Sequence, residues 1–287
     1  MSKPAVQTIL KLLSGLSLRN QYRVADLVSF FVYHSPNQLS RQARENIQMC
    51  FAEESQAWQT RLTRESIRHT CYSLFELAAV WCWPAQRILE QLDDKQAGAV
   101  LEQSSRGKII IAPHLGSWEL LNIWLARQGA SLSLYRPLRN RRHAQFVLES
   151  RSRNGAELVP TTTAGLRKLL RGLQQGSSVM LLTDQKPAAK KNSVDAAFFG
   201  LQASTTTLVN SLLKKVDCDV FIAAACRSQP AGRFELLLKA LDSARLAGDA
   251  SGSTQYMNDE IEQLAMQFAE QYQWTYRRFT ANEYQQL

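Results

Sequence analysis

Residues 108–121 read KIIIAPHLGSWELL, a pattern that predicts a buried strand, a tight turn and then a helix. Residues 109–112 form a short apolar run rich in β-branched side chains, which suits a strand covered on both faces. Gly116 and Ser117 are typical of a turn followed by a helix N-cap. His114 therefore lies at the carboxyl end of a predicted strand, where open α/β sheets bind their ligands.

Glu119 falls in the first turn of the predicted helix, where the helix dipole favours a negative charge. This carboxylate could fold back to bond one nitrogen of the His114 imidazole and leave the other nitrogen free as a general base. The same spacing also occurs by chance, so a surface or core histidine remains the alternative. The spacing is not that of a zinc site, and no metal is predicted.

Strands and helices are expected to alternate from residue 107 onward, with a small polar loop at residues 247–253. This rhythm predicts an α/β fold with a mostly parallel sheet and helices on both of its faces. The expected strands cover residues 109–112, 131–135, 157–160, 178–183, 220–226 and 234–240, and the expected helices cover residues 118–127, 140–153, 163–175, 204–215 and 255–271.

Residues 1–100 are predicted to be mainly helical, with helices at residues 40–51, 58–79 and 85–92. The first segment places leucines at helical spacing beside lysine and arginine, which suits a helix lying in a membrane interface and equally a helix that covers the core. We expect a membrane-facing helical region (residues 1–100) packed on an α/β core (residues 101–287) as one integrated domain.

The composition and charge indicate what kind of partner the protein binds. Lys and Arg number 34 against 25 Asp and Glu, a net charge of +9, so the partner is expected to be anionic. No nucleic-acid reader motif accompanies this charge, which favours a membrane surface or an acidic carrier. The five cysteines are scattered and odd in number, which indicates reduced thiols. No apolar run is long enough to predict a transmembrane helix.

Asp184 and Gln185 directly follow the strand expected at residues 178–183. Because the carboxyl ends of parallel strands meet at one edge of a sheet, both residues are expected near His114 and are candidates for binding substrate. Asp184 could orient a substrate or pair with an arginine, and a simple cap of the loop is the alternative.

Several motifs occur along the chain in a consistent order. They read RENIQMCF at residues 44–51, PHLGSWE at 113–119, YRPLRN at 135–140, RSRNG at 151–155, LTDQKP at 182–187, FFG at 198–200 and WTYRRF at 274–279. Together they resemble the bacterial lipid A late acyltransferases, the lauroyl and myristoyl transferase group, from about residue 40 to the C-terminus. The joint order is far more specific than any single motif.

The resemblance implies an acyltransferase with a glycerolipid-acyltransferase-like fold that moves a fatty acyl chain from acyl carrier protein to a hydroxyl of a lipid acceptor. The family's His-x-x-x-x-Glu dyad corresponds to His114 and Glu119. No cofactor is implied beyond the acyl-carrier donor, and the expected location is the cytoplasmic face of the bacterial inner membrane. Many members begin with a transmembrane helix, whereas this chain is expected to attach peripherally to an anionic membrane surface.

The resemblance also suggests roles for further residues. Arg153, or the backbone amides of Gly116 and Ser117, could stabilise the oxyanion. Arg136 and Arg139 are expected to meet phosphates of the acceptor or the carrier, and Trp118 could line an acyl channel. Two alternatives remain: transfer to another lipid, such as a lysophospholipid or a specialised glycolipid, and a lipid-binding protein without catalysis.

Overall fold

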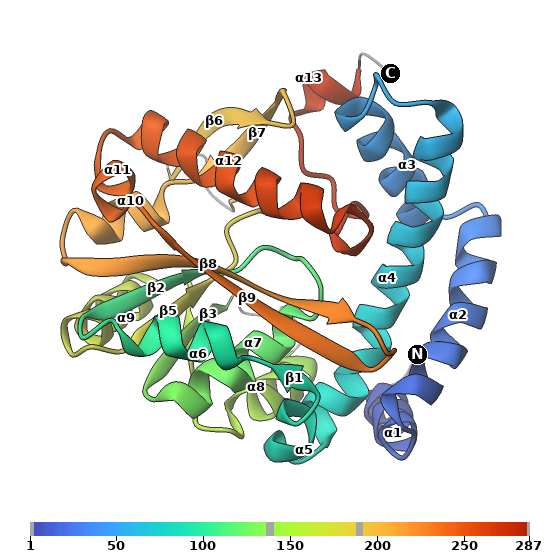
Figure 1. The fold of residues 1–287 in the computed structure, drawn as a ribbon, viewed down its shortest axis with the longest axis horizontal. Coiled ribbons are helices and arrows are strands. Elements are labelled where there is room, and N and C mark those ends of the chain that lie inside the picture. The colour runs from blue at the N-terminus through green and yellow to red at the C-terminus, as the bar shows by residue number, and fades with distance from the viewer. Residues whose placement is uncertain (1–2, 136–140, 188–191, 286–287) are drawn as a thin grey trace.

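A seven-stranded sheet lies at the centre of the computed structural model, which describes residues 3–135, 141–187 and 192–285 (Figure 1). The strand order across the sheet is β1-β9-β8-β2-β5-β3-β4, so β2, the strand before His114, occupies the middle. The strands are β1 (Leu92–Asp93), β2 (Gly107–Ile111), β3 (Ser131–Tyr135), β4 (Glu157–Pro160), β5 (Ser178–Leu181), β8 (Cys218–Ser228) and β9 (Arg233–Leu241).

The sheet is mostly parallel, which confirms the predicted fold class. Strands β8, β2, β5, β3 and β4 pair in parallel, and β9 returns antiparallel to β8 with β1 parallel to it at the edge. The loops that follow β2 and β5 therefore leave the sheet on the same side. This geometry brings the segment after Ile111 next to the segment after Leu181.

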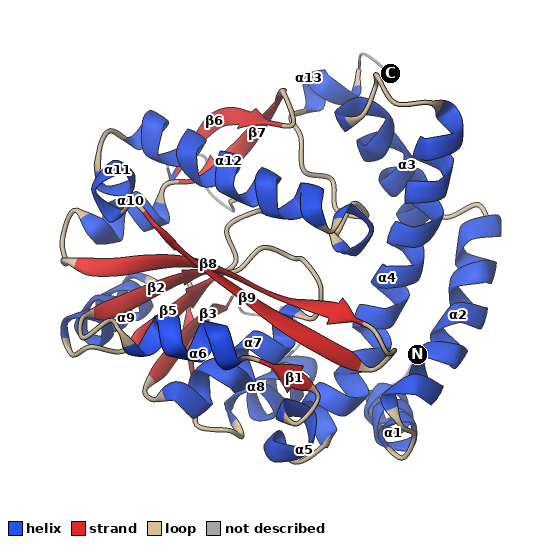
Figure 2. Ribbon diagram, in the orientation of Figure 1, coloured by secondary structure: helices blue, strands red, loops and turns tan. Residues whose placement is uncertain are grey.

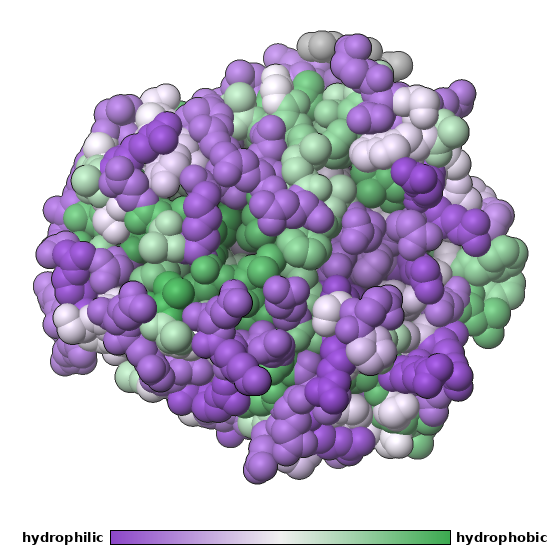
Figure 3. Space-filling model, viewed as in Figure 1, coloured by the Kyte–Doolittle hydropathy of each residue, from purple (hydrophilic) through white to green (hydrophobic). Residues whose placement is uncertain are grey.

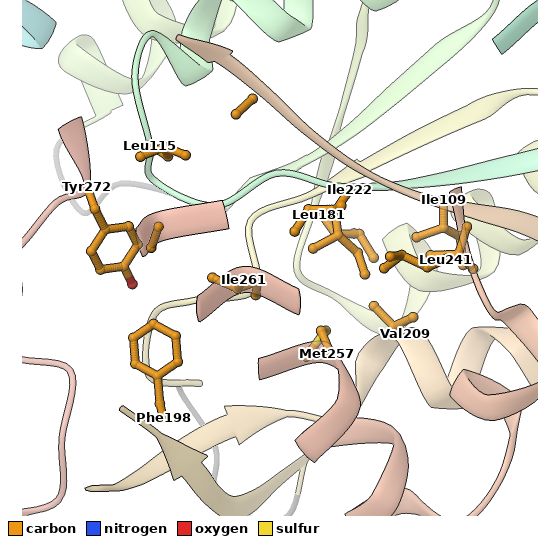
Figure 4. Close-up of a cluster of buried hydrophobic side chains, with 14 of the residues drawn as sticks. Ile109, Leu115, Leu181, Phe198, Val209, Ile222, Leu241, Met257, Ile261 and Tyr272 are labelled. Atoms are coloured by element: carbon orange, nitrogen blue, oxygen red, sulfur yellow. The ribbon is translucent and has the colours of Figure 1, made fainter. Parts of the chain in front are cut away.

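Both faces of the sheet are buried, as the continuous apolar runs predict. Alternate residues of β2 point to opposite faces of the sheet. Ile109 and Ile111 pack with α9, α10 and α12, in the cluster of which Figure 4 shows a part. Ile110 packs on the other face with α5, α6 and α7 (Figure 2). The helices are α5 (Ala85–Leu89), α6 (Lys95–Glu102), α7 (Trp118–Gln128), α8 (Arg141–Ser152), α9 (Thr163–Gln174), α10 (Leu208–Leu213), α11 (Ser243–Ala247), α12 (Ala250–Gln267), η2 (Ala269–Gln271) and α13 (Ala281–Tyr284).

The first four helices are α1 (Lys3–Ser14), α2 (Leu18–His34), α3 (Gln38–Cys50) and α4 (Gln56–Cys82). The longest, α4, runs along one side of the molecule, where α1, α2 and α3 all contact it (Figure 1). Asn46 of α3 donates to the carbonyl oxygens of Trp274 and Tyr276, at 2.6 and 2.7 Å, so the first and last parts of the chain are joined. Across the described residues, every helix is too short or too polar to cross a membrane.

Several predicted boundaries are wrong. The helix expected at residues 85–92 ends at Leu89, because Leu92–Asp93 forms the edge strand β1. The helix expected from residue 204 begins only at Leu208, because residues 193–206 form a hairpin of β6 (Ser193–Phe198) and β7 (Leu201–Thr206). Its two-residue turn has positive φ angles, the arrangement that matches the twist of a hairpin. Of the loop expected at residues 247–253, residues 250–253 form the first turn of α12, because Asp249 caps two backbone amides there.

Candidate active site

The turn between β2 and α7 fixes the position of His114. Gly116 has a φ of 60°, and a Cβ at this position would lie 2.2 Å from the carbonyl oxygen of Ala225, so only glycine fits. The amide of Ser117 donates to that same oxygen at 2.8 Å, and the amide of Gly116 donates to the carbonyl of Gln271 at 3.2 Å. The turn is therefore held against β8 on one side and the C-terminal segment on the other.

Asp184 is the carboxylate bonded to His114. The Nδ1 atom of His114 lies 2.8 Å from Asp184 Oδ1, and the His114 backbone amide donates to Oδ2 at 2.8 Å. Burial alone would raise the pKa of Asp184, but the interactions with His114 and the nearby charge of Arg278 hold this pKa below its ordinary value. Asp184 is thus an anion that accepts two hydrogen bonds from one histidine.

The opposite nitrogen of the imidazole faces Gln185. The side-chain amide of Gln185 lies 3.2 Å from His114 Nε2 and donates to Gln273 Oε1 at 3.1 Å. An anionic Asp184 requires a proton on Nδ1, so Nε2 of the neutral ring accepts the hydrogen bond from Gln185. Nε2 therefore carries a lone pair, which is the state that a general base needs.

Two further side chains lie behind Asp184. Tyr272 and Arg278 are both buried, and Arg278 is fixed by donating to the carbonyl of Ser204 at 2.7 Å and to the hydroxyl of Thr205. Burial raises the pKa of Tyr272 well above its ordinary value, and the charge of Asp184 adds to this rise. Arg278 lies in the WTYRRF motif at residues 274–279, but the motif alone does not indicate that this arginine is buried behind Asp184.

Glu119 does not bond to His114 as expected. Its Oε2 accepts hydrogen bonds from Trp81 Nε1 at 3.1 Å and from Arg151 Nε at 2.9 Å, and Arg151 Nη2 also bonds to Oε1. The predicted hydrogen-bond partner of the imidazole is therefore wrong. The physical reason is helical phase: at the start of α7 the side chain points toward α4 and α8, and away from the loop after β5. The catalytic role of Glu119 stays a prediction.

Arg151, rather than Arg153, reaches the site. Burial lowers the pKa of Arg151, but the charge and hydrogen bonds of Glu119 outweigh burial and raise it overall. Arg153 is exposed and donates to the carbonyl of Val80 at 2.6 Å. Helix α8 ends at Ser152, so Arg151 still projects from the helix toward the pocket while Arg153 lies beyond it. The RSRNG motif at residues 151–155 indicated an arginine at the site, but it did not indicate which of its two arginines reaches the pocket.

The predicted oxyanion donors are likewise corrected. The amides of Gly116 and Ser117 already donate to protein carbonyls, so neither is directed at a substrate. Arg136 and Arg139 lie outside the described residues. Within the described ranges, the side chains form no cluster of three or more His, Cys, Asp or Glu residues suited to a metal ion.

A pocket of about 330 Å³ opens in front of His114. Trp118, predicted as a substrate contact, lies in its wall with its ring centroid 5.1 Å from that of His114. Gln185, Glu119 and Arg151 contribute polar groups to the same wall. The remaining walls are mainly apolar and come from α4 and α8, through Leu74, Leu77, Trp81, Val147 and Leu148. His114 and Glu119 therefore share a pocket without sharing a hydrogen bond.

Comparison with known proteins gives the family. The sequence profile of the bacterial lipid A biosynthesis acyltransferases matches residues 5–281. The chain is 25% identical over 243 residues to the lipid A biosynthesis palmitoleoyltransferase of Escherichia coli K12, covering 83% of this chain and 77% of that protein. It has the same identity and coverage with a lipid A biosynthesis acyltransferase of Shigella flexneri. With a matching profile over nearly its whole length, the chain belongs to the bacterial lipid A biosynthesis acyltransferase family.

Proposed function

We propose that this protein transfers a fatty acyl chain from the thioester of acyl carrier protein directly to a hydroxyl of a lipid A precursor. The observation that carries the proposal is the state of His114. Its Nδ1 is bonded to an anionic Asp184, and its ring forms part of a largely apolar pocket. A base oriented in this way, beside a site able to hold an alkyl chain, suits acyl transfer between lipophilic substrates.

The proposed reaction needs no protein nucleophile. His114 Nε2 accepts the proton of the acceptor hydroxyl as its oxygen attacks the thioester carbonyl. When the tetrahedral adduct collapses, the C–S bond breaks and the imidazolium returns the proton to the leaving thiolate. One ester replaces one thioester, and Asp184 stabilises the cationic ring between the two proton transfers.

Arg151 and Glu119 serve a different part of this reaction. Arg151 is the only Lys or Arg in the described wall of the pocket, so it is the cation available to the developing oxyanion. Glu119 bonds two of its nitrogens and fixes the orientation of the guanidinium. In this proposal Glu119 is needed for turnover because it positions Arg151, and not because it touches the imidazole.

The charge of the protein fits both of the proposed partners. A net charge of +9 favours an acidic carrier protein and an anionic lipid surface. Use of acyl carrier protein places the reaction on the cytoplasmic face of the inner membrane, and the donor supplies the activated acyl group without a further cofactor.

The test is turnover by purified protein with acyl carrier donor and lipid A precursor dispersed in detergent. His114→Ala is expected to lower kcat by a factor on the order of 10² to 10⁴, because it removes the base. His34→Ala, which alters an exposed histidine on α2, is the matched control and should retain turnover. Full activity in folded His114→Ala protein would show that His114 is not the base. Equal turnover with acyl-coenzyme A would show that the enzyme does not prefer acyl carrier protein as its donor.

A further inference from the structure

Helix α2 carries four large apolar side chains on its outside. Its buried positions are Leu18, Gln21, Tyr22, Ala25 and Ser29, so three of the five are polar or small. Its outward face carries Leu27 and Phe31, which are 61% and 60% exposed. A helix that only covers a core keeps its bulky apolar residues inside, whereas α2 also exposes several of them.

These outward residues form one stripe. Val24, Leu27, Phe30 and Phe31 follow the i, i+3, i+6, i+7 spacing of a single helical face, and we call them the α2 stripe. Phe30 is 52% and Val24 is 38% exposed. In Figure 3 the hydrophobic surface at the right edge of the molecule lies over α2. Single exposed apolar residues are ordinary, but four on one helical face indicate a binding surface.

The surroundings of the stripe are basic. Lys11, Arg19 and Arg23 are exposed on α1 and α2. Residues 3–34 contain a single acidic side chain, Asp26. Its carboxylate is already paired with Arg68 at 2.6 Å. The stripe is therefore accompanied by positive charges, which a negatively charged surface would complement.

We propose that the α2 stripe docks into the headgroup region of an anionic lipid bilayer, with Arg19 and Arg23 meeting lipid phosphates. Only one side of the helix enters lipid, because the opposite side is packed on α4 through the stacked rings of Tyr22 and Tyr72. A second copy of the chain is a poorer occupant, since it would bring the same basic residues face to face.

This docking would set the position of the active site. Helix α4 lies between the two features: Tyr72 and Glu76 contact α2, whereas Leu74 and Trp81 line the pocket of His114. Packed helices are separated by about 8 to 10 Å, so the pocket would lie about one helix from the lipid. This consequence rests on the proposed function, but binding of the stripe to lipid does not.

The experiment is sedimentation of the full chain with vesicles of phosphatidylcholine, alone or mixed with phosphatidylglycerol. Leu27→Ser/Phe31→Ser is expected to lower partitioning onto the mixed vesicles roughly tenfold or more, because apolar area no longer enters the interface. Met266→Ser, which removes a side chain of similar exposure (53%) on α12, is the matched control and should bind normally. Arg19→Gln/Arg23→Gln should lower binding several-fold on anionic vesicles only.

Two results would overturn the proposal. One is unchanged vesicle binding by folded Leu27→Ser/Phe31→Ser protein. The other is a concentration-dependent dimer that this variant abolishes, since the stripe would then be an interface between copies. Turnover on detergent-dispersed substrate is measured in parallel and should be unchanged in all three variants. Absence of turnover in the parent protein would count against the proposed function alone, because vesicle binding is read separately.

Discussion

The two carboxylates of the candidate site stand in different surroundings. Asp184 follows a strand, is buried, and accepts hydrogen bonds from the ring and backbone of His114. Glu119 lies in the first turn of a helix and accepts hydrogen bonds from Trp81 and Arg151. Asp184 is bonded to His114, the proposed base, whereas Glu119 is bonded to Arg151, the cation of the pocket. The residue five positions from His114 is therefore not its partner, whereas the residue 70 positions away is.

The largest effect is expected from Asp184→Asn, which replaces the carboxylate bonded to His114. The amide cannot act as an anionic acceptor for the Nδ1 proton, so it favours the wrong tautomer of His114 and no longer stabilises the imidazolium. We expect kcat to fall by a factor on the order of 10² to 10⁴, with a smaller effect on KM. Steady-state kinetics with the dispersed substrates measure this, and Asp93→Asn, an exposed aspartate on β1, is the control. An Asp184→Asn enzyme with the parent kcat would contradict the pairing.

A second, smaller effect is expected at Glu119. Glu119→Gln keeps the shape of the side chain but no longer offers Arg151 a charged partner, so the guanidinium is less well placed. Turnover should fall roughly 10- to 100-fold, and Glu53→Gln at an exposed site should have no effect. The double variant Glu119→Gln/Arg151→Gln should lose little more than Arg151→Gln alone, because the two residues act as one unit. Additive losses would show that Glu119 acts independently of Arg151.

The sequence predicted the sheet well because its strands are short apolar runs between glycines and polar turns. The expected ranges for β3 and β4 coincide with the observed ones. The hairpin of β6 and β7 was missed because residues 201–206 lack large alternating apolar side chains. The hairpin is stabilised by contact with α12, for instance where Gln255 and Asn258 bond to the backbone of Ala197 on β6. Such contacts between distant segments leave no local pattern.

The candidate site likewise has features that follow from local sequence patterns and features that depend on contacts between distant segments. That His114 and Asp184 share an edge follows from the parallel sheet, because both end neighbouring strands. The direction of Glu119 does not follow, since it depends on the rotation of α7 against α4 and α8. The choice between Arg151 and Arg153 depends on where α8 ends, and helix ends are uncertain by one or two residues from sequence alone.

The smallest expected effect concerns stability in acid. The pKa of Asp184 is lowered in the folded protein by His114 and Arg278, against the effect of burial. An aspartate with a lowered pKa contributes stability at pH values above its ordinary pKa of about 4, and this contribution is lost as pH falls through the lowered value. The free energy of unfolding of the parent should therefore exceed that of Asp184→Asn most above about pH 5, and the gap should narrow toward about pH 3.

Denaturant unfolding at several pH values measures this gap, with Asp93→Asn as the exposed control. Glu119→Gln provides the comparison, because its gap reports the pairing with Arg151 instead of the pairing with His114. A gap for Asp184→Asn that widens in acid would mean that the folded protein holds this carboxyl protonated. The anion would then be absent, Nδ1 would not need to carry the proton, and the assignment of Nε2 as the base would lose its physical ground.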